Sequence, residues 1–200
     1  MFDGLKLFLD QFVKLSEADY AQLKERIIVK QYLKKEIMIK AGETEQHLYF
    51  VAKGLIRQYF NVGKEDVIID IISEGTITGS VTSFLTGSPS RYFMETMEPV
   101  TVFALSKQNL EELYLSHNKW ERFGRILTAH FFLEQERHIL DNIRLSMKER
   151  VINFVKENPD LVLRVPQKYL ASYLDIKPET FSRMKHLLFD SKRNKAGIEN

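Results

Sequence analysis

The chain has 200 residues, of which 44% are hydrophobic and 28% are charged, and its formal net charge is +2. This composition is typical of a globular protein with one or two domains, and it excludes a uniformly basic nucleic-acid coat protein. The sequence contains no cysteine, which excludes disulfides, thiolate metal sites, cysteine-ligated iron–sulfur clusters and a cysteine nucleophile.

The first 30 residues predict one short helix. It is expected to begin after Ser16, with Asp19 completing a capping box, and to carry Leu23 and Ile27 on its apolar face. The residues before it include an acidic side chain, Asp3, and no clean apolar run, which argues against a secretory signal. Because no stretch approaches the ~20 apolar residues of a membrane span, we expect a cytoplasmic protein with no membrane partner.

A region rich in β-branched and aromatic residues follows and extends to about Leu105. Glycines divide it into short runs at 36–40, 48–51, 55–60, 67–72 and 100–105. Regularly spaced short strands with glycine-containing turns are typical of antiparallel sandwiches and barrels. The sequence therefore predicts an antiparallel β domain in the amino-terminal half.

Residues 107–146 contain one glycine, Gly124, and no proline, and they predict a long helix after a shorter lead-in. Apolar residues and histidines follow two rows at helical spacing: Phe123, Ile126, His130, Leu133, Leu140 and Met147 in one, and Leu127, Phe131, His138 and Leu145 in the other. A helix that is apolar on more than one side needs two partners. We expect these to be the β domain and a second copy of the chain, joined in a two-stranded coiled coil; the alternative is a core helix within one monomer.

The segment from Val165 to Leu188 predicts a helix, a tight turn and a second helix. The first helix is expected to start at Pro166, since proline suits a first helical position, and the turn is expected at Asp175, where aspartate tolerates a positive φ. Pro178 follows the turn and pushes Lys177 out of the α region. The apolar stripe on the inward side of the second helix is Phe181, Met184 and Leu188. This is the layout of a DNA-reading helix-turn-helix.

The outward residues of this unit have the chemistry of DNA contacts. An arginine such as Arg183 can pair with guanine, and a glutamate such as Glu179 can accept from cytosine. Other polar side chains suit phosphate oxygens, which set the register on the duplex: Lys168, Thr180, Ser182 and Lys185. Lys177, just before the second helix, adds to the predicted DNA-binding residues. The alternative is an amphipathic helical hairpin with a solvated charged face.

The order of these elements resembles the Crp/Fnr family of bacterial transcription regulators, whose sensor is a cyclic-nucleotide-binding-type domain. Three segments carry the resemblance. Residues 48–59 (LYFVAKGLIRQY) resemble the family's strand-glycine-strand hairpin, residues 74–79 (EGTITG) resemble the start of its phosphate loop, and residues 175–188 (DIKPETFSRMKHLL) resemble its recognition helix. The resemblance covers nearly the whole chain and implies a homodimer that binds double-stranded DNA.

The resemblance also implies an effector site, with departures from the family pattern. In members that bind cyclic nucleotides, a glutamate that binds the ribose follows the loop glycine, whereas here Ser80 follows Gly79. The family's Arg-Ser or Arg-Thr pair matches Ser90 and Arg91, so the arginine is displaced by one position. On a strand, a shift of one residue turns the side chain to the opposite face. A one-residue shift in the loop would restore the original direction of the arginine side chain. The implied effector-binding residues are Gly79, Ser80, Val81, Ser90 and Arg91. The missing carboxylate argues against cyclic AMP and leaves another small anion, an apolar effector or no ligand.

The carboxyl-terminal end departs from the family as well. The family's second base-reading position, usually arginine, matches Pro178, which implies an altered or relaxed half-site. Residues 191–200 (SKRNKAGIEN) are too poor in apolar side chains for a stable wing hairpin. We expect a truncated wing and a flexible tail in which Lys192, Arg193 and Lys195 lie near phosphates.

These features together predict an α+β protein in three parts. A jelly-roll-like antiparallel double-stranded β-roll sensor occupies residues 1–106, a long dimerisation helix 107–146, and a helix-turn-helix domain with its tail 147–200. We expect a homodimeric, sequence-specific transcription regulator rather than an enzyme, controlled by a small effector, with RNA polymerase as a partner implied by the resemblance.

Two other functions stay open on the sequence. One is a ligand-binding regulatory protein that acts on a protein partner. The other is a cupin-type metalloenzyme, which needs several histidines converging from neighbouring strands, whereas residues 30–105 contain only His47. A haem sensor would need an axial ligand, and the spacing of the histidines singles none out. We therefore expect no metal site.

Overall fold

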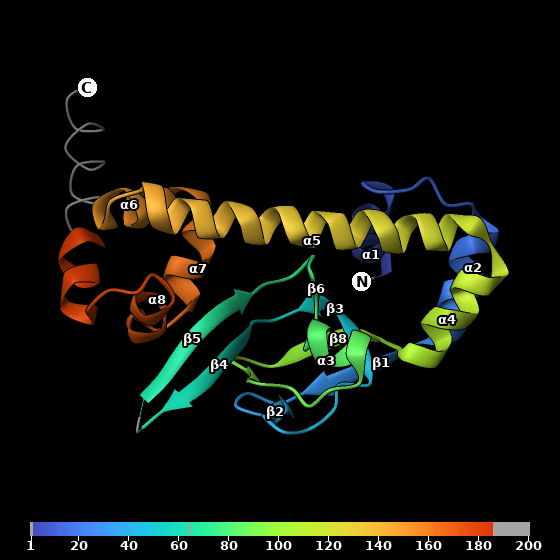
Figure 1. The fold of residues 1–200 in the computed structure, drawn as a ribbon, viewed down its shortest axis with the longest axis horizontal. Coiled ribbons are helices and arrows are strands. Elements are labelled where there is room, and N and C mark those ends of the chain that lie inside the picture. The colour runs from blue at the N-terminus through green and yellow to red at the C-terminus, as the bar shows by residue number, and fades with distance from the viewer. Residues whose placement is uncertain (1, 64, 186–200) are drawn as a thin grey trace.

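The computed structural model describes residues 2–63 and 65–185. A β-roll of two four-stranded sheets lies beneath one long helix, and a helix-turn-helix domain lies at the carboxyl-terminal end of that helix (Figure 1). The expected fold class, an antiparallel β-roll followed by a long helix and a helix-turn-helix, is confirmed. The predictions for Leu188 and for the tail fall outside the described residues.

The β-roll consists of two antiparallel sheets packed face to face. Their strand orders are β1-β8-β3-β6 and β2-β7-β4-β5. The strands are β1 (Ile27–Tyr32), β2 (Ile37–Ile39), β3 (His47–Lys53), β4 (Ile56–Val62), β5 (Glu65–Ile72), β6 (Ile77–Thr78), β7 (Phe93–Thr96) and β8 (Val100–Ser106). Between the sheets lie side chains with no exposed surface, among them Val51, Ile56, Met94 and Val102. The short helix α3 (Val81–Thr86) follows β6.

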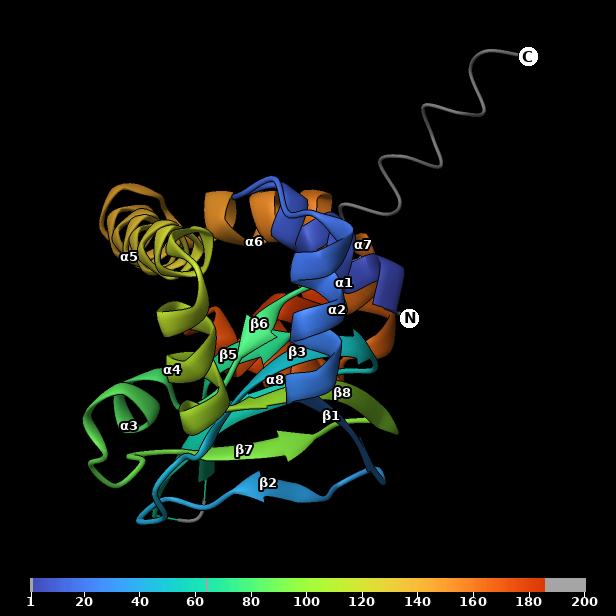
Figure 2. The same cartoon turned by 90° about the vertical axis from the view of Figure 1, so that its right-hand side faces the viewer.

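Helices cover the outer face of the first sheet. Successive side chains of a strand point to opposite faces, so Phe50 of β3 faces outward while Val51 faces the second sheet. The covering helices are α1 (Phe2–Asp10), α2 (Glu17–Arg26), α4 (Lys107–Ser116) and α5 (Asn118–Arg144). Figure 2 shows them on the same side of this sheet. Trp120 of α5 is 2% exposed and lies in the cluster that they form with the sheet.

Two long-range constraints modify the predicted elements. Ile27 does not lie on the first predicted helix: α2 ends at Arg26, and Ile27 begins β1 by pairing with Leu105 of β8. The capping box of Ser16 and Asp19 is present as predicted. Among the helices and strands given above, α1, β1, β6, α3 and β7 lie where no helix or strand was expected. Pairing with β8 explains β1, because residues 28 and 29 leave apolar side chains exposed and their pattern alone does not indicate a strand.

The long helix changes environment along its length. His117 separates α4 from α5, and its Nδ1 accepts a hydrogen bond from the Lys119 N–H, which caps the second helix. Phe123 and Leu127, in the amino-terminal half of α5, are buried against the β-roll. The carboxyl-terminal half instead exposes large apolar side chains, with Ile143 at 76%.

The helix-turn-helix domain shares its core with the second sheet. It comprises α6 (Met147–Glu157), α7 (Pro159–Arg164), α8 (Gln167–Tyr173) and a further helix over 178–185. Val151, Leu170 and Phe181 have no exposed surface, and they pack in one cluster with Tyr59 of β4 and Ile68 of β5. The predicted boundaries after 106 and after 146 coincide with the end of β8 and the start of α6, and the division into domains stays a prediction.

Gly54 joins β3 to β4 at a point where no side chain fits. Its φ is +98°, and an added Cβ would lie 2.5 Å from the Pro99 carbonyl oxygen. Gly42 has a similar φ of +93° with nothing within 4 Å of an added Cβ. Both alanine variants carry a conformational penalty of ~1–3 kcal/mol, and Gly54→Ala adds overpacking of ~1–3 kcal/mol. We expect urea unfolding to show a larger loss of stability for Gly54→Ala, and equal losses would contradict the close approach.

Candidate functional site

The helix-turn-helix is built by an unusual backbone conformation at its turn. Asp175 has a φ of +53°, as predicted for this position. Its N–H donates to the Ser172 carbonyl and the Ile176 N–H donates to the Ala171 carbonyl, so the last carbonyls of α8 are satisfied. The next helix starts on the Lys177 carbonyl, which accepts from the Phe181 N–H. The turn therefore fixes the direction in which the second helix leaves.

Phe181 and the half-buried Met184 hold this second helix on the domain core, as predicted. The predicted base-reading residues, Glu179 and Arg183, are exposed on its other side. Lys177, just before this helix, and Lys168 of α8 are exposed as well. Thr180 and Ser182 are half-buried. The predicted phosphate-contacting residue Lys185 is also half-buried, and its ammonium donates to the Val162 carbonyl of α7 at 3.3 Å. Lys168 lies over the Tyr169 ring, 4.7 Å from its centroid.

A charged cluster fastens this domain to the β-roll. Arg164, the last residue of α7, donates to Glu74 at 2.8 Å and also to Glu98, while Asp160 is its partner on the same helix. Partial burial alone would raise the pKa of Glu74, but hydrogen bonds from Arg164 and from the Gly54 N–H outweigh it and lower that pKa to about 2. Glu74 therefore stays charged at neutral pH and keeps the arginine in place.

A second arginine lies beneath α8, the first helix of the helix-turn-helix. Arg57 of β4 is 5% exposed and forms ion pairs with Asp66 at 2.7 Å and with Glu95 at 3.1 Å. Its guanidinium stacks between two tyrosines, 4.1 Å from the Tyr59 ring and 4.4 Å from the Tyr169 ring of α8. The sequence analysis missed both Arg57 and Arg164. Their partners lie far away in sequence, and no local pattern marks them.

A direct backbone contact completes this docking. The Ile68 N–H of β5 donates to the Ser172 hydroxyl at 3.0 Å. Ser172 precedes Asp175 in the turn of the helix-turn-helix by three residues. The β4–β5 ribbon is therefore hydrogen-bonded directly to the helix-turn-helix. A displacement of this ribbon would therefore act on the orientation of the second helix.

The predicted effector residues other than Arg91 lie around a cluster of polar groups in the β-roll. Gly79, Ser80 and Val81 form the junction of β6 and α3, and Ser80 is 1% exposed. Beside them lies the carboxylate of Glu45, 4% exposed, which accepts from the His47 N–H and the Tyr49 hydroxyl. Burial raises the pKa of Glu45, although these hydrogen bonds oppose the rise. The sequence analysis missed Glu45, which the strand pairing brings to this loop.

Polar groups of the β-roll itself already satisfy this site. Gln58 donates to the Gly79 carbonyl at 3.3 Å and to the Thr78 hydroxyl, and the Tyr92 hydroxyl donates to the same Gly79 carbonyl. The Ser90 hydroxyl donates to the Tyr92 carbonyl. Arg91 is exposed, so a ligand in this site would have to draw it inward.

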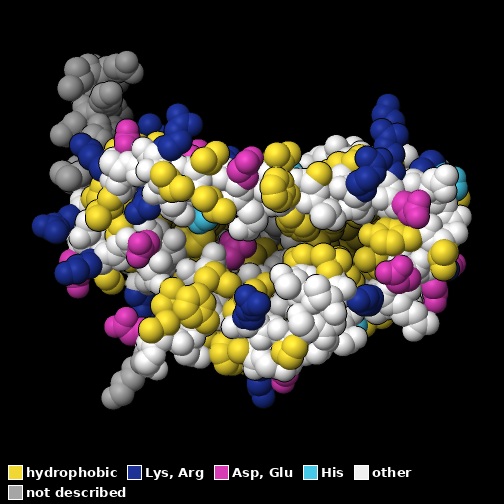
Figure 3. Space-filling model, in the orientation of Figure 1, with side chains coloured by type: hydrophobic (Ala, Val, Ile, Leu, Met, Phe, Trp, Pro, Cys, Tyr) yellow, Lys and Arg dark blue, Asp and Glu magenta, His cyan; other side chains and the backbone are white. Residues whose placement is uncertain are grey.

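A larger cavity of about 470 Å³ lies between α5 and the rest of the chain. Its lining comes from β5, β6, α5, α6, α7 and α8, and it includes Asp70, His138 and Tyr173. The rings of His138 and Tyr173 are in contact, with centroids 5.7 Å apart. Burial raises the pKa of Asp70, while the Ile71 N–H and His138 oppose the rise. Figure 3 shows this face hollowed beneath α5.

The comparisons with known proteins agree with this architecture. Residues 29–117 match the cyclic nucleotide-binding domain family. FixK2 from Bradyrhizobium japonicum has 22% sequence identity and a TM-score of 0.72, over 83% of this chain and 86% of that one. CLP from Xanthomonas campestris, described as a c-di-GMP-responsive global regulator, has 14% identity and a TM-score of 0.66, over 88% and 93%. No protein with a curated description matches the chain.

The fold joins a cyclic-nucleotide-binding-type domain to a helix-turn-helix. This is the architecture of the Crp/Fnr-type structures, which confirms the predicted resemblance. A regulator from Eubacterium rectale described as a member of that family has 12% identity and a TM-score of 0.65, over 88% of this chain and 85% of that one. In the described part of the chain, none of the helices is long and apolar enough to cross a membrane.

The pKa of Glu74 predicts how stability depends on pH. Its folded value, about 2, lies below the ordinary 4.5. Its charge therefore contributes stability above pH 4.5, and this contribution is lost as the pH falls towards 2. We expect thermal melts between pH 4.5 and pH 2 to show a smaller loss of stability for Glu74→Gln than for the unmodified protein. Glu17→Gln, which removes the pair with Lys6 from an 86% exposed glutamate, is the control and should change little; an unchanged profile for Glu74→Gln would contradict the role of the cluster.

Proposed function

We propose that this protein is a homodimeric, sequence-specific DNA-binding transcription regulator of the Crp/Fnr type. The observation that carries the proposal is the exposed pair Glu179 and Arg183 on a helix whose opposite side is fixed by Phe181, which has no exposed surface. A rigid helix with exposed polar residues near its start is what major-groove recognition requires. Two such helices about a dyad would enter successive major grooves, about 34 Å apart.

The dimer is proposed from the exposed apolar side chains of α5. Phe132 and Ile139 are seven residues apart, as are Leu133 and Leu140, and all four are at least 44% exposed. Seven-residue spacing is the repeat of a two-stranded coiled coil. The amino-terminal ends of both predicted rows face the β-roll instead, because Phe123 and Leu127 are 7% and 6% exposed. Hydrophobic side chains reach the surface along α5 in Figure 3, where a second copy would bury them.

The proposed control is a small effector in the β-roll at Gly79, Ser80, Val81, Ser90 and Arg91. Support comes from the family match and from one structural relative that is described as responsive to c-di-GMP. Ser80 carries no charge, and Glu45, Gln58 and Tyr92 already satisfy the site, which disfavours cyclic AMP. Coupling between such sites is typically worth ~1–3 kcal/mol. RNA polymerase is a further proposed partner.

Arg183→Ala tests base recognition. Selection from a random duplex library at about 150 mM salt should first yield a near-palindrome with half-sites about one helical turn apart. On that site Arg183→Ala should weaken binding by ~1–3 kcal/mol and relax specificity at one base pair. Lys177→Ala is the matched control and should weaken all sequences alike while flattening the salt dependence. An equal loss for Arg183→Ala on random DNA would contradict a base-reading role, and no enrichment at all would favour a protein partner.

Ile143→Glu tests the dimer. Ile143 is 76% exposed on α5, and a charge in an apolar seam is strongly unfavourable. We expect sedimentation velocity to show a dimer for the unmodified protein and a monomer for the variant, with DNA affinity reduced at least tenfold. Leu115→Glu is the control, because Leu115 is 88% exposed on α4, away from the seam. A monomeric unmodified protein, or a dimeric Ile143→Glu, would contradict the proposed interface.

A further inference from the structure

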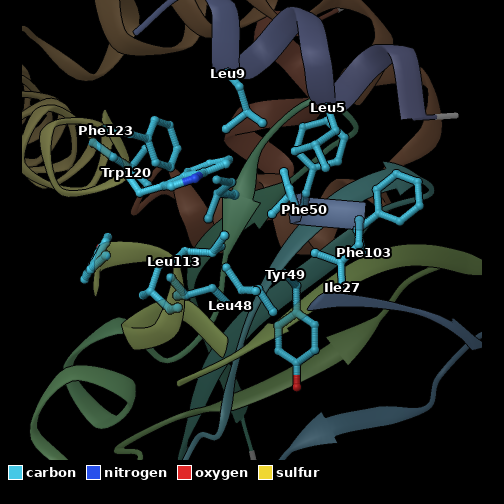
Figure 4. A pocket seen from close by; sticks show the side chains of 16 residues that line it. Leu5, Leu9, Ile27, Leu48, Tyr49, Phe50, Phe103, Leu113, Trp120 and Phe123 are labelled. Atoms are coloured by element: carbon cyan, nitrogen blue, oxygen red, sulfur yellow. The ribbon is translucent and has the colours of Figure 1, made fainter. Parts of the chain in front are cut away.

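An apolar cavity of about 60 Å³ lies on the outer face of the first sheet, apart from the polar site inside the β-roll. Figure 4 shows its walls: Leu5 and Leu9 of α1, Leu48 and Phe50 of β3, and Trp120 and Phe123 of α5. The cavity therefore lies where the amino-terminal helix, the sensor sheet and the long helix meet.

The polar groups around this cavity are already engaged or directed elsewhere. Among the described residues that line it, three carry a polar side-chain atom, namely Tyr49, Tyr114 and Trp120. The Tyr49 hydroxyl points away from the cavity in Figure 4 and donates to Glu45. The Trp120 indole N–H donates to the Gln22 side chain at 3.3 Å. The Tyr114 hydroxyl lies against the backbone of α5, 2.2 Å from where a Cβ on Gly124 would stand. A ligand in this cavity would therefore contact the carbon atoms of the lining side chains.

The position of the cavity links it to both halves of the regulator. Leu48 forms part of its wall, and the same side chain lies 3.4 Å from where a Cβ on Gly79 would stand. Across the cavity, Trp120, Phe123 and Leu127 all belong to α5. A ligand in this cavity would thus contact α5, the helix proposed for dimerisation. Only the Leu48 side chain would separate it from Gly79, the glycine at the phosphate-loop position.

We propose that this cavity is a binding site for a small uncharged apolar molecule, no larger than a short alkyl chain or a single ring. Cavities lined by aliphatic and aromatic side chains stay dry and accept such ligands, and one of ~150 Å³ binds benzene or xenon. At about 60 Å³ this cavity accepts a xenon-sized group directly, whereas a ring requires its walls to move apart. Binding itself is independent of the proposed function, whereas its effect on α5 rests on that function.

The single tryptophan makes the test direct. Trp120 is the only tryptophan of the chain and is 2% exposed in the cavity wall, so its emission reports on this site alone. We expect benzene to change the emission of the full-length protein in a saturable way. Benzoate at equal concentration should not, because burying its charge without a partner is unfavourable.

Two leucine-to-phenylalanine variants locate the site. Leu48→Phe fills the cavity and should weaken benzene binding at least tenfold, whereas Leu115→Phe, on the exposed side of α4, should bind like the unmodified protein. A linear or absent response to benzene, or equal affinity in a folded Leu48→Phe, would overturn the proposal. If thermal melts show that Leu48→Phe is unfolded, xenon-induced methyl shifts in the unmodified protein decide: shifts at Leu5, Leu9 and Leu48 support the site, and shifts confined to other methyls overturn it.

DNA binding is measured separately, so the two proposals fail independently. Saturable benzene binding by a protein that selects no DNA sequence would leave the cavity site standing and overturn the proposed function. Selection of an operator with no response of Trp120 to benzene would overturn the cavity site and leave the proposed function standing.

Discussion

The hydrophobic cluster shared by the β4–β5 ribbon and the helix-turn-helix domain is the constraint on which the rest of the structure depends. The helix-turn-helix domain is small, and its core is completed by Tyr59 and Ile68 of the β-roll. Burying apolar surface is non-directional, so this cluster holds the two parts together but does not by itself fix their orientation. Directional polar contacts at its edges supply that orientation.

Those polar contacts place charge where water is partly excluded. Arg57 lies buried between two carboxylates and two tyrosine rings, and Arg164 holds acidic partners from two separate loops. Removing one member of a buried ion pair is strongly unfavourable. Because each arginine joins the β-roll to the helix-turn-helix domain, a movement of one relative to the other would break these contacts together.

Local sequence patterns predicted those parts of the fold that depend on local chemistry. The Ser16 capping box, the positive φ of Asp175 and the inward Phe181 follow from residue type and spacing alone. The strand β1 could not be found in this way, because it exists through pairing with β8, more than 60 residues further along the chain. For the same reason Glu45, Arg57 and Arg164 carry no local signal, although they determine the polar site and the docking. Lys185 is predictable as a surface cation, but its hydrogen bond to Val162 depends on how α7 is placed.

The docking contact between Ile68 and Ser172 joins residues 104 positions apart, and that between Glu74 and Arg164 spans 90. Contacts so distant in sequence form slowly, because a long loop must close before they contribute stability. During synthesis the β-roll precedes its partner, since domains tend to fold from the amino terminus as they emerge. The apolar side of the β4–β5 ribbon is therefore exposed on the ribosome until α6 to α8 have been made. A newly made chain therefore passes through a stage at which this ribbon is exposed and prone to aggregation, and the helix-turn-helix domain ends that stage.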